Sequence, residues 1–145
     1  MHTWGEILKE LNATKNPQGT GPDFDTVRRK YLRELSLLTG RATILYSTAY
    51  LESRVIPPAS LQISLADMQG FMEAVSNIEE KKVDLIIHSS GGQAEAAESI
   101  VDYLRSRFEH VRIFVPIAAM SAATMIALSG NEICAIETSN FILQY

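Results

Sequence analysis

Two short stretches of this chain carry residues that could perform covalent chemistry. Residues 84–92 read Asp-Leu-Ile-Ile-His-Ser-Ser-Gly-Gly, and residues 118–125 read Ala-Ala-Met-Ser-Ala-Ala-Thr-Met. Each is an apolar run that ends in small residues and then continues into a helical pattern. This is where an α/β protein presents backbone N–H groups to a ligand. Together they predict a nucleophilic serine, Ser121, and a glycine turn whose N–H groups stabilise an oxyanion.

The glycine turn at 89–92 lets the backbone approach a ligand closely, because Gly91 and Gly92 have no Cβ atoms. Phosphate binding is one use of such a turn. The sequence lacks a G-x-G-x-x-G pattern and a Walker lysine, and Glu95 and Glu98 in the following helix disfavour an anionic ligand. We therefore expect no nucleotide cofactor. No other cofactor and no metal site are expected either.

The residue types alone leave two interpretations of Ser121 open. It begins a helical pattern, so its hydroxyl could be a nucleophile at the positive end of the helix dipole. Serine is also a common N-cap, and in that role its hydroxyl only accepts a hydrogen bond from a backbone N–H.

Composition argues against several classes of function. The 145 residues carry a net charge of −4, and the basic residues are scattered, so we expect no nucleic-acid partner. No stretch approaches the roughly 18 apolar residues that span a bilayer, and the first residues do not form a secretory signal. We expect a soluble, cytoplasmic protein, with membrane association left open. The lone cysteine, Cys134, lies in an apolar run and is expected to be a buried, inert thiol.

The first part of the sequence predicts helices. A capping box at Thr3–Glu6 begins a short amphipathic helix that reaches Leu11, and a turn-rich connector follows through residue 24. Asp25 is expected to cap a second helix that ends at Gly40. A third helix, over 64–78, is predicted to turn five residues inward, namely Leu65, Met68, Phe71, Met72 and Val75.

The remainder alternates strand and helix patterns. Strands are expected at 42–47, 83–88, 111–115, 133–136 and 141–143, and helices at 93–108 and 121–128. Continuous apolar runs indicate strands covered on both faces, and the alternation indicates parallel pairing. The predicted fold class is α/β, a mainly parallel sheet with flanking helices. We expect an N-terminal helix and connector over 1–24 and one α/β domain over 25–145.

These motifs resemble the serine dehydrogenase proteinase family. The Gly91-Gly92 turn is similar to the family's Ser-Pro-Gly-Gly oxyanion loop, and Ser121 is similar to its nucleophile. The stretch at 39–46 and the Trp4-Gly5 helix are similar to the family's N-terminal part. The family belongs with signal peptide peptidase A and the Clp proteases in the Clp/crotonase fold. The resemblance therefore implies that fold, with ββα-type units, a peptide or protein substrate and a homo-oligomer.

Two features depart from the family pattern. Ser90 stands where proline is usual, which loosens the turn because the fixed φ of proline is lost. Clp-like proteases usually place a His or Lys base after the nucleophile, whereas the residues after Ser121 include no His, Lys, Arg or Asp. The domain over 25–145 is therefore expected to be incomplete at its C-terminus. His88 is the best-placed substitute within the chain, either as a base or as a support for the loop.

Three hypotheses follow. In the first, Ser121 forms an acyl-enzyme with peptide substrates, Ala122 and Gly91 or Gly92 donate N–H groups to the oxyanion, and the base lies outside these 145 residues. The isolated chain would then be inactive. In the second, the chain is a non-catalytic assembly or binding member of the same fold. The third is a crotonase-like acyl-CoA enzyme, which is disfavoured because such enzymes usually carry a glycine-rich segment at 121–124.

Overall fold

The structure is a computed structural model, and it describes residues 3–51, 55–135 and 140–142. The chain divides after Gly40 into two compact units, residues 1–40 and residues 41–145. We describe each unit by itself. The domain boundary that the sequence places after residue 24 stays a prediction.

The first unit consists of two helices joined by a turn-rich connector. The capping box of Thr3 and Glu6 begins α1 (Trp4–Ala13), as the sequence predicts. The second helix, α2 (Phe24–Thr39), ends at Gly40, which adopts φ 65°. The predicted cap was wrong: the carboxylate of Asp23 caps α2 and accepts the N–H of Thr26 at 3.0 Å. Asp25 instead lies within the first turn of the helix.

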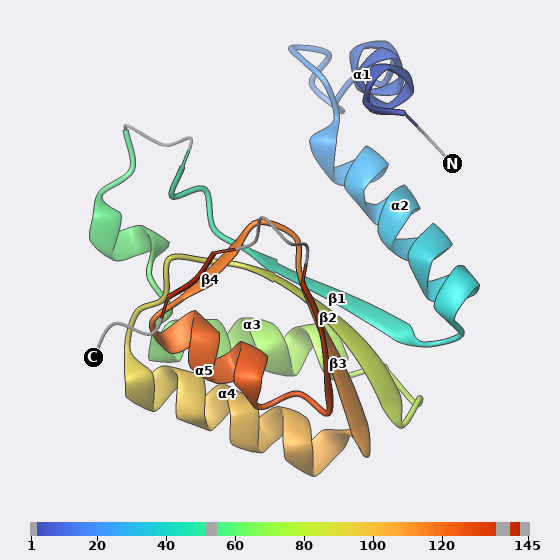
Figure 1. The fold of residues 1–145 in the computed structure, drawn as a ribbon. Helices are drawn as coiled ribbons and strands as arrows, with labels where there is room; N and C mark the ends of the chain where they lie inside the picture. The colour runs from blue at the N-terminus through green and yellow to red at the C-terminus, as the bar shows by residue number, and fades with distance from the viewer. Residues whose placement is uncertain (1–2, 52–54, 136–139, 143–145) are drawn as a thin grey trace. The chain divides into compact units, whose positions relative to one another are not determined.

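The second unit is built on a parallel sheet in the order β1-β2-β3-β5 (Figure 1). Its register aligns Ile44 with Leu85, Leu85 with Ile113, and Ile113 with Ile133. All three of these pairings are parallel, so the predicted α/β class with a mainly parallel sheet is confirmed. The strands of this sheet are β1 (Ala42–Ser47), β2 (Lys82–His88), β3 (His110–Val115) and β5 (Glu132–Ala135).

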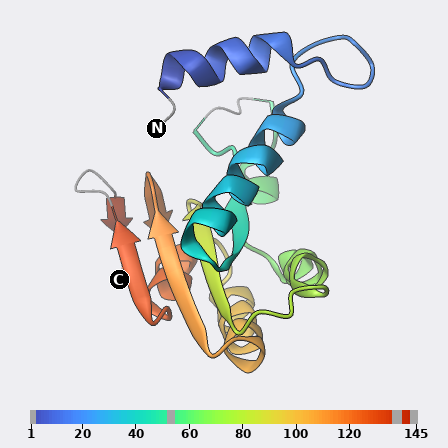
Figure 2. The same cartoon turned by 90° about the vertical axis from the view of Figure 1, so that its right-hand side faces the viewer.

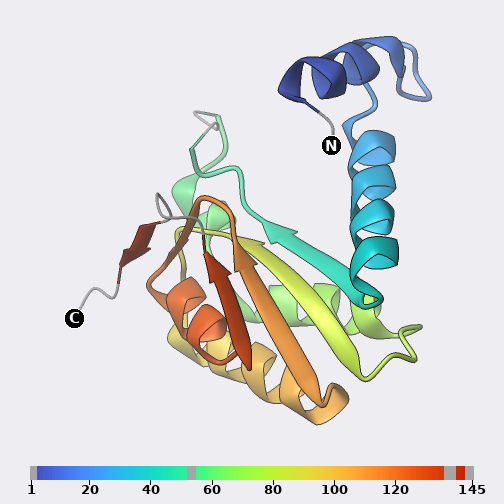
Figure 3. The same cartoon turned by 45° about the vertical axis from the view of Figure 1, so that its right-hand side comes forward.

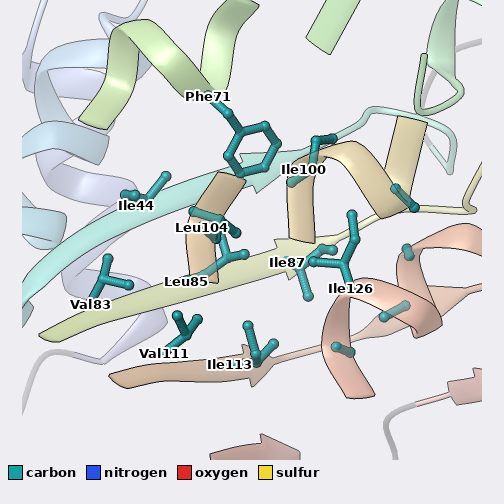
Figure 4. Close-up of a cluster of buried hydrophobic side chains, with 14 of the residues drawn as sticks. Ile44, Phe71, Val83, Leu85, Ile87, Ile100, Leu104, Val111, Ile113 and Ile126 are labelled. Carbon is teal, nitrogen blue, oxygen red and sulfur yellow. The ribbon is translucent and has the colours of Figure 1, made fainter. Parts of the chain in front are cut away.

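One face of this sheet carries the helices of the second unit (Figures 2 and 3). The side chains of Leu85, Ile87 and Ile113 point from β2 and β3 toward Ile100 and Ile126 on the helices (Figure 4). Removing this apolar surface from water is the main source of stability for such a layer. The helices are α3 (Leu65–Val75), α4 (Ala94–Arg107) and α5 (Ala122–Leu128), and a short 3-10 helix, η1 (Pro58–Leu61), precedes α3.

Three sequence expectations were wrong in this layer. Leu65 and Met72 on α3 are exposed rather than buried, at 57% and 44%, although Phe71 and Val75 are buried. The helix also ends at Val75 instead of residue 78, because the hydroxyl of Ser76 turns back to the carbonyl of Glu73.

The expected burial of strands on both faces holds only for the interior of the sheet. The edge strand β5 is exposed along its length. Cys134 lies on β5 and is therefore exposed, so the prediction of a buried thiol was wrong.

The opposite face of the sheet carries a network of charges. Asp84 is fully buried and contacts Nε of Arg41 at 2.8 Å and Nη2 of Arg112 at 2.8 Å. His110 contacts Arg41 through Nδ1 at 2.7 Å and Glu132 through Nε2 at 3.2 Å. These side chains link all the strands of the sheet by charge-assisted contacts.

A second, smaller sheet lies beside the first. It pairs β4 (Ala118–Met120) with β6 (Asn140–Ile142) in parallel. β4 was not predicted, because its three small or flexible residues carry no strand pattern in the sequence. The predicted strand at 141–143 corresponds to β6, and residues 136 and 143, where two predicted strands end, lie outside the described residues. In the described residues, every helix is too short or too polar to cross a membrane.

Candidate active site

Two backbone hydrogen bonds bring the two sequence motifs together. The N–H of Ser89, just after β2, donates to the carbonyl of Ala118 at 3.1 Å. The N–H of Met120 donates to the carbonyl of Ser89 at 3.1 Å. These bonds form a bridge between Ser89 and Ala119, so the glycine turn and Ser121 lie side by side.

Gly91 packs directly against the serine. A Cβ atom at this position would meet the carbonyl oxygen of Met120, and it would lie 2.8 Å from Cβ of Ser121 and 3.0 Å from the nitrogen of Ala122. The backbone of Gly91 also adopts φ 95°, a region that disfavours every residue with a side chain. Glycine is therefore required here for both conformation and space.

Gly92 is fixed from the other side by Ile63. The N–H of Ile63 donates to the carbonyl of Gly91 at 2.9 Å, and the carbonyl of Ile63 accepts the N–H of Gln93 at 2.8 Å. Because neighbouring residues of a strand direct their polar groups to opposite sides, the N–H of Gly92 faces away from Ile63. The N–H of Gly91 is already used, since it donates to the hydroxyl of Ser89 at 3.1 Å. Of the two glycines, Gly92 thus has the N–H that is available to a ligand.

Ser121 stands at the junction of β4 and α5 in a strained conformation. Its φ of 53° and ψ of −124° make it the only non-glycine residue with positive φ in the described ranges. Such conformations cost about 1–3 kcal/mol, and they occur preferentially at active sites. Ser121 occupies the N-cap position, yet its side chain makes no capping hydrogen bond and the residue is exposed.

The residues that follow Ser121 anchor this strained turn. Ala122, Ala123 and Thr124 are buried. The hydroxyl of Thr124 donates to the carbonyl of Ala119 at 2.6 Å and so ties α5 to β4. In the first turn of α5 the N–H groups of Thr124 and Met125 donate to the carbonyl of Ser121, at 2.9 and 3.3 Å, whereas the N–H of Ala122 has no partner within the helix. The roles of Thr124, Ser89 and Ile63 were not predicted, and only the small side chains of α5 indicated the close packing in the sequence.

His88 lies at the end of β2 and is 7% exposed. Its ring lies 5.0 Å from the ring of Tyr50, and neither ring nitrogen has a hydrogen-bond partner among the described residues. No hydrogen bond joins it to Ser121, and within this part of the chain no other histidine or lysine is bonded to the serine. Whether His88 acts as base or loop support stays a prediction.

The site lies apart from the cavity between β1 and α3, which has a volume of about 280 Å³. That cavity is lined by apolar residues together with Tyr46 and Asp67. In the described ranges, no three His, Cys, Asp or Glu side chains gather as a metal site requires. Among the described residues, the groups brought together at the site are the hydroxyl of Ser121 and the backbone of the glycine turn.

Both the sequence and the fold of the chain are similar to those of known proteins. The model of the ClpP-like SDH-type serine proteinases matches residues 26–142. The chain is 32% identical over 120 residues to the uncharacterized protein MJ0137 of Methanocaldococcus jannaschii, across 81% of this chain and 42% of that protein. It is 35% identical over 72 residues to MJ1495 of the same organism, across 49% of this chain and 25% of that protein. The chain thus spans less than half the length of either relative.

A mutant of ClpP1 from Listeria monocytogenes has a similar structure, with a TM-score of 0.55. The two share 17% sequence identity, and the match covers 75% of this chain and 58% of that one. At this identity the likeness concerns the fold. It confirms the expected Clp-like arrangement, in which β3, β4 and α5 make one ββα-type unit.

Proposed function

The chain belongs to the family of ClpP-like SDH-type serine proteinases, and we propose that it is a serine peptidase chain with Ser121 as its nucleophile. The observation that carries this proposal is the backbone of Ser121. A serine that only capped a helix would adopt an extended conformation and accept a backbone N–H. Ser121 does neither: it is strained, uncapped and exposed next to the glycine turn. Strain of this kind is maintained where it presents a reactive group.

The proposed oxyanion donors are the N–H groups of Gly92 and Ala122. Gly91 has a different role, because its N–H is held by Ser89 and its missing Cβ lets the loop contact Ser121. Donors that are fixed in advance do not have to reorganise when charge develops, and each is typically worth about 10²–10³ in rate.

The reaction then proceeds in two halves. A general base removes the proton from Oγ of Ser121 as Oγ forms a bond to the carbonyl carbon of the peptide. The carbonyl electron pair moves to oxygen, which accepts the N–H groups of Gly92 and Ala122. When the C–N bond breaks, the amine leaves with the proton from the base, and the acyl group stays on Ser121. Water, deprotonated by the same base, releases the acid and restores the serine.

The general base is proposed to lie outside these 145 residues. The described histidines and lysines make no hydrogen bond to Ser121, and a serine without a base is a weak nucleophile. Peptide or protein substrates and a homo-oligomer are likewise proposals that follow from membership of the family. The isolated chain is expected to show little or no peptide hydrolysis.

A fluorophosphonate probe tests the nucleophile in the natural full-length protein. Labelling should disappear in Ser121→Ala and persist in the matched control Ser106→Ala, since Ser106 lies on α4 and its hydroxyl donates to the carbonyl of Tyr103 at 2.8 Å. Equal labelling of Ser121→Ala and the parent would refute the assignment. If the parent protein is folded but takes up no probe, the chain would instead be a non-catalytic member of the family. The observation that supports this second role is that no His or Lys follows Ser121 in the sequence.

A further inference from the structure

The peptide group between Gly91 and Gly92 has two faces of opposite chemistry. The peptide is trans, so its carbonyl and its N–H point in opposite directions. An N–H stabilises a developing oxyanion, whereas a carbonyl oxygen in the same place repels it. The orientation of this one peptide group therefore decides whether the glycine turn can serve the proposed reaction.

The two glycines do not fix that orientation by themselves. Rotation of the peptide group changes ψ of Gly91 and φ of Gly92, and glycine adopts positive and negative φ about equally well. Glycine is nevertheless needed at position 92, because a Cβ atom there would collide with the backbone nitrogen and oxygen of Ile63. The residues that allow the turn to pack closely thus also allow the peptide group to rotate, unless a hydrogen bond holds it.

The backbone of Ile63 supplies that hydrogen bond. Its N–H donates to the carbonyl of Gly91 at 2.9 Å, and its carbonyl accepts the N–H of Gln93 at 2.8 Å. These two bonds form the parallel bridge between Ile63 and Gly92. On the other side, the N–H of Gly91 donates to the hydroxyl of Ser89 at 3.1 Å. The peptide groups before and after the 91–92 peptide are therefore fixed by bonds of their own, and the bond from Ile63 fixes the one between them.

Ile63 is itself firmly held. Its side chain is fully buried. The residue directly precedes the capping box of α3, in which the N–H of Ser64 donates to the carboxylate of Asp67 at 2.7 Å. A donor that is anchored in the core and at the start of a helix does not have to reorganise when charge develops at the turn.

We propose that the N–H of Ile63 holds the Gly91–Gly92 peptide with the N–H of Gly92 on the side away from Ile63, and that Ile63 is thereby a positioning residue for the oxyanion. Without this bond the carbonyl of Gly91 can rotate into the place of the Gly92 N–H. The turn then loses a donor and gains an oxygen that repels the developing charge. Only the catalytic meaning of this orientation rests on the proposed function.

Backbone NMR spectra of the intact chain test the orientation without any need for activity. Ile63→Pro removes the N–H donor, and the preceding residue already suits a proline, because Gln62 is extended at φ −96° and ψ 150°. The ¹³C signal of the Gly91 carbonyl and the ¹H–¹⁵N signal of Gly92 should both shift. Ile63→Ala is the matched control: it truncates the same buried side chain but keeps the N–H, and it should shift both signals much less.

An ester at position 63 decides the question if Ile63→Pro does not fold. Incorporation of the α-hydroxy acid that corresponds to isoleucine keeps the side chain and replaces only the N–H by oxygen. It should shift the carbonyl signal of Gly91 and the amide signal of Gly92 as Ile63→Pro does. Unmoved signals in a folded Ile63→Pro or ester protein, or equal shifts in Ile63→Ala, would overturn the proposal.

Probe labelling of the full-length protein adds a separate readout. Ile63→Pro should slow the labelling of Ser121 about 10²-fold or more, which is the loss typical of one oxyanion donor, and Ile63→Ala should slow it far less. If the parent is not labelled at all, the proposed peptidase function fails, while the NMR signals still decide whether Ile63 orients the peptide. Labelling of Ile63→Pro at the parental rate would reject the positioning role.

Discussion

Ser121 is held in a backbone conformation that serine seldom adopts, and the loop beside it depends on a missing side chain. The small residues around Ser121 and Gly91 indicated both positions in the sequence. They did not decide whether Ser121 is a nucleophile or an N-cap. The backbone angles φ and ψ of Ser121 distinguish these two roles. The residue types near Ser121 do not specify those angles, because contacts with other strands set them. Here the constraint comes from the bridge between Ser89 and Ala119 and from the bond of Thr124 to Ala119.

The strain at Ser121 predicts an unusual order of stability. Ser121→Gly should raise the free energy of unfolding by about 1 kcal/mol, because glycine adopts φ 53° without steric strain. The strain that is removed exceeds the extra conformational entropy that glycine loses on folding. Ser121→Ala keeps the penalty and should not gain. Urea unfolding of the three proteins measures the difference. A Ser121→Gly protein that is less stable than the parent would show that the turn is not strained.

Gly91→Ala should destabilise the protein by several kcal/mol and abolish probe labelling. The new Cβ would collide with the carbonyl of Met120 and the side chain of Ser121. Gly70→Ala is the matched control, since a Cβ on Gly70 meets nothing within 4 Å and the residue lies inside α3. It should stabilise by about 0.5–1 kcal/mol. Thermal unfolding and probe labelling should be measured for both variants. If the melting temperatures of Gly91→Ala and Gly70→Ala shifted in the same direction, the proposed role of Gly91 would be contradicted.

At the scale of elements, sequence periodicity located helices and strands well and their edges less well. Phe71 and Val75 repeat at helical spacing and are buried, but Leu65 and Met72 belong to the same apolar pattern and lie outside the packed stripe. The stripe that a helix buries is set by the angle at which it meets the sheet, and no local pattern specifies that angle. Cys134 was misplaced for a related reason, because the order of strands decides which one lies at an edge.

The contact between β1 and α3 predicts a loss of stability in alkali. Burial raises the pKa of the Tyr46 phenol, and the nearby carboxylate of Asp67 raises it further. Since the folded-state pKa lies above the unfolded value of about 10, the stabilisation is fully present below pH ~10 and is lost as the pH rises further.

Unfolding free energies measured at increasing pH should therefore fall less steeply above pH ~10 in Tyr46→Phe than in the parent. Tyr103→Phe on α4 serves as the control for the loss of a phenol elsewhere. Identical alkaline slopes for Tyr46→Phe and the parent would contradict the burial of a neutral Tyr46.

At the scale of the whole second unit, the charge network on the sheet face opposite the helices links strands that the sequence shows only as separate apolar runs. The sequence predicted the α/β class and the motifs of the site because those depend on local patterns. It did not predict that Asp84 pairs with Arg41 and Arg112, because these residues are 43 and 28 positions apart from it along the chain. Neither did it predict the small sheet of β4 and β6, whose partners meet only through long-range pairing.

Asp84→Asn should lower the free energy of unfolding by about 3 kcal/mol or more, because it removes a fully buried carboxylate that pairs with the guanidinium groups of both Arg41 and Arg112. Asp25→Asn is the control, since Asp25 and Arg29 form an exposed pair at 2.7 Å. Its effect should stay below about 1 kcal/mol. Chemical denaturation of the two variants compares them directly. Equal effects would mean that the buried network adds nothing beyond a surface pair.

The bridge between Ser89 and Ala119 has a consequence for how such a protein can diversify. Its two hydrogen bonds involve only main-chain atoms, so substitutions at either residue leave the donors and acceptors in place, proline excepted. Inheritance of the bridge therefore does not depend on inheritance of any one side chain. Lineages that share this scaffold are free to exchange a base, a binding pocket or even the nucleophile while the two loops keep their mutual position.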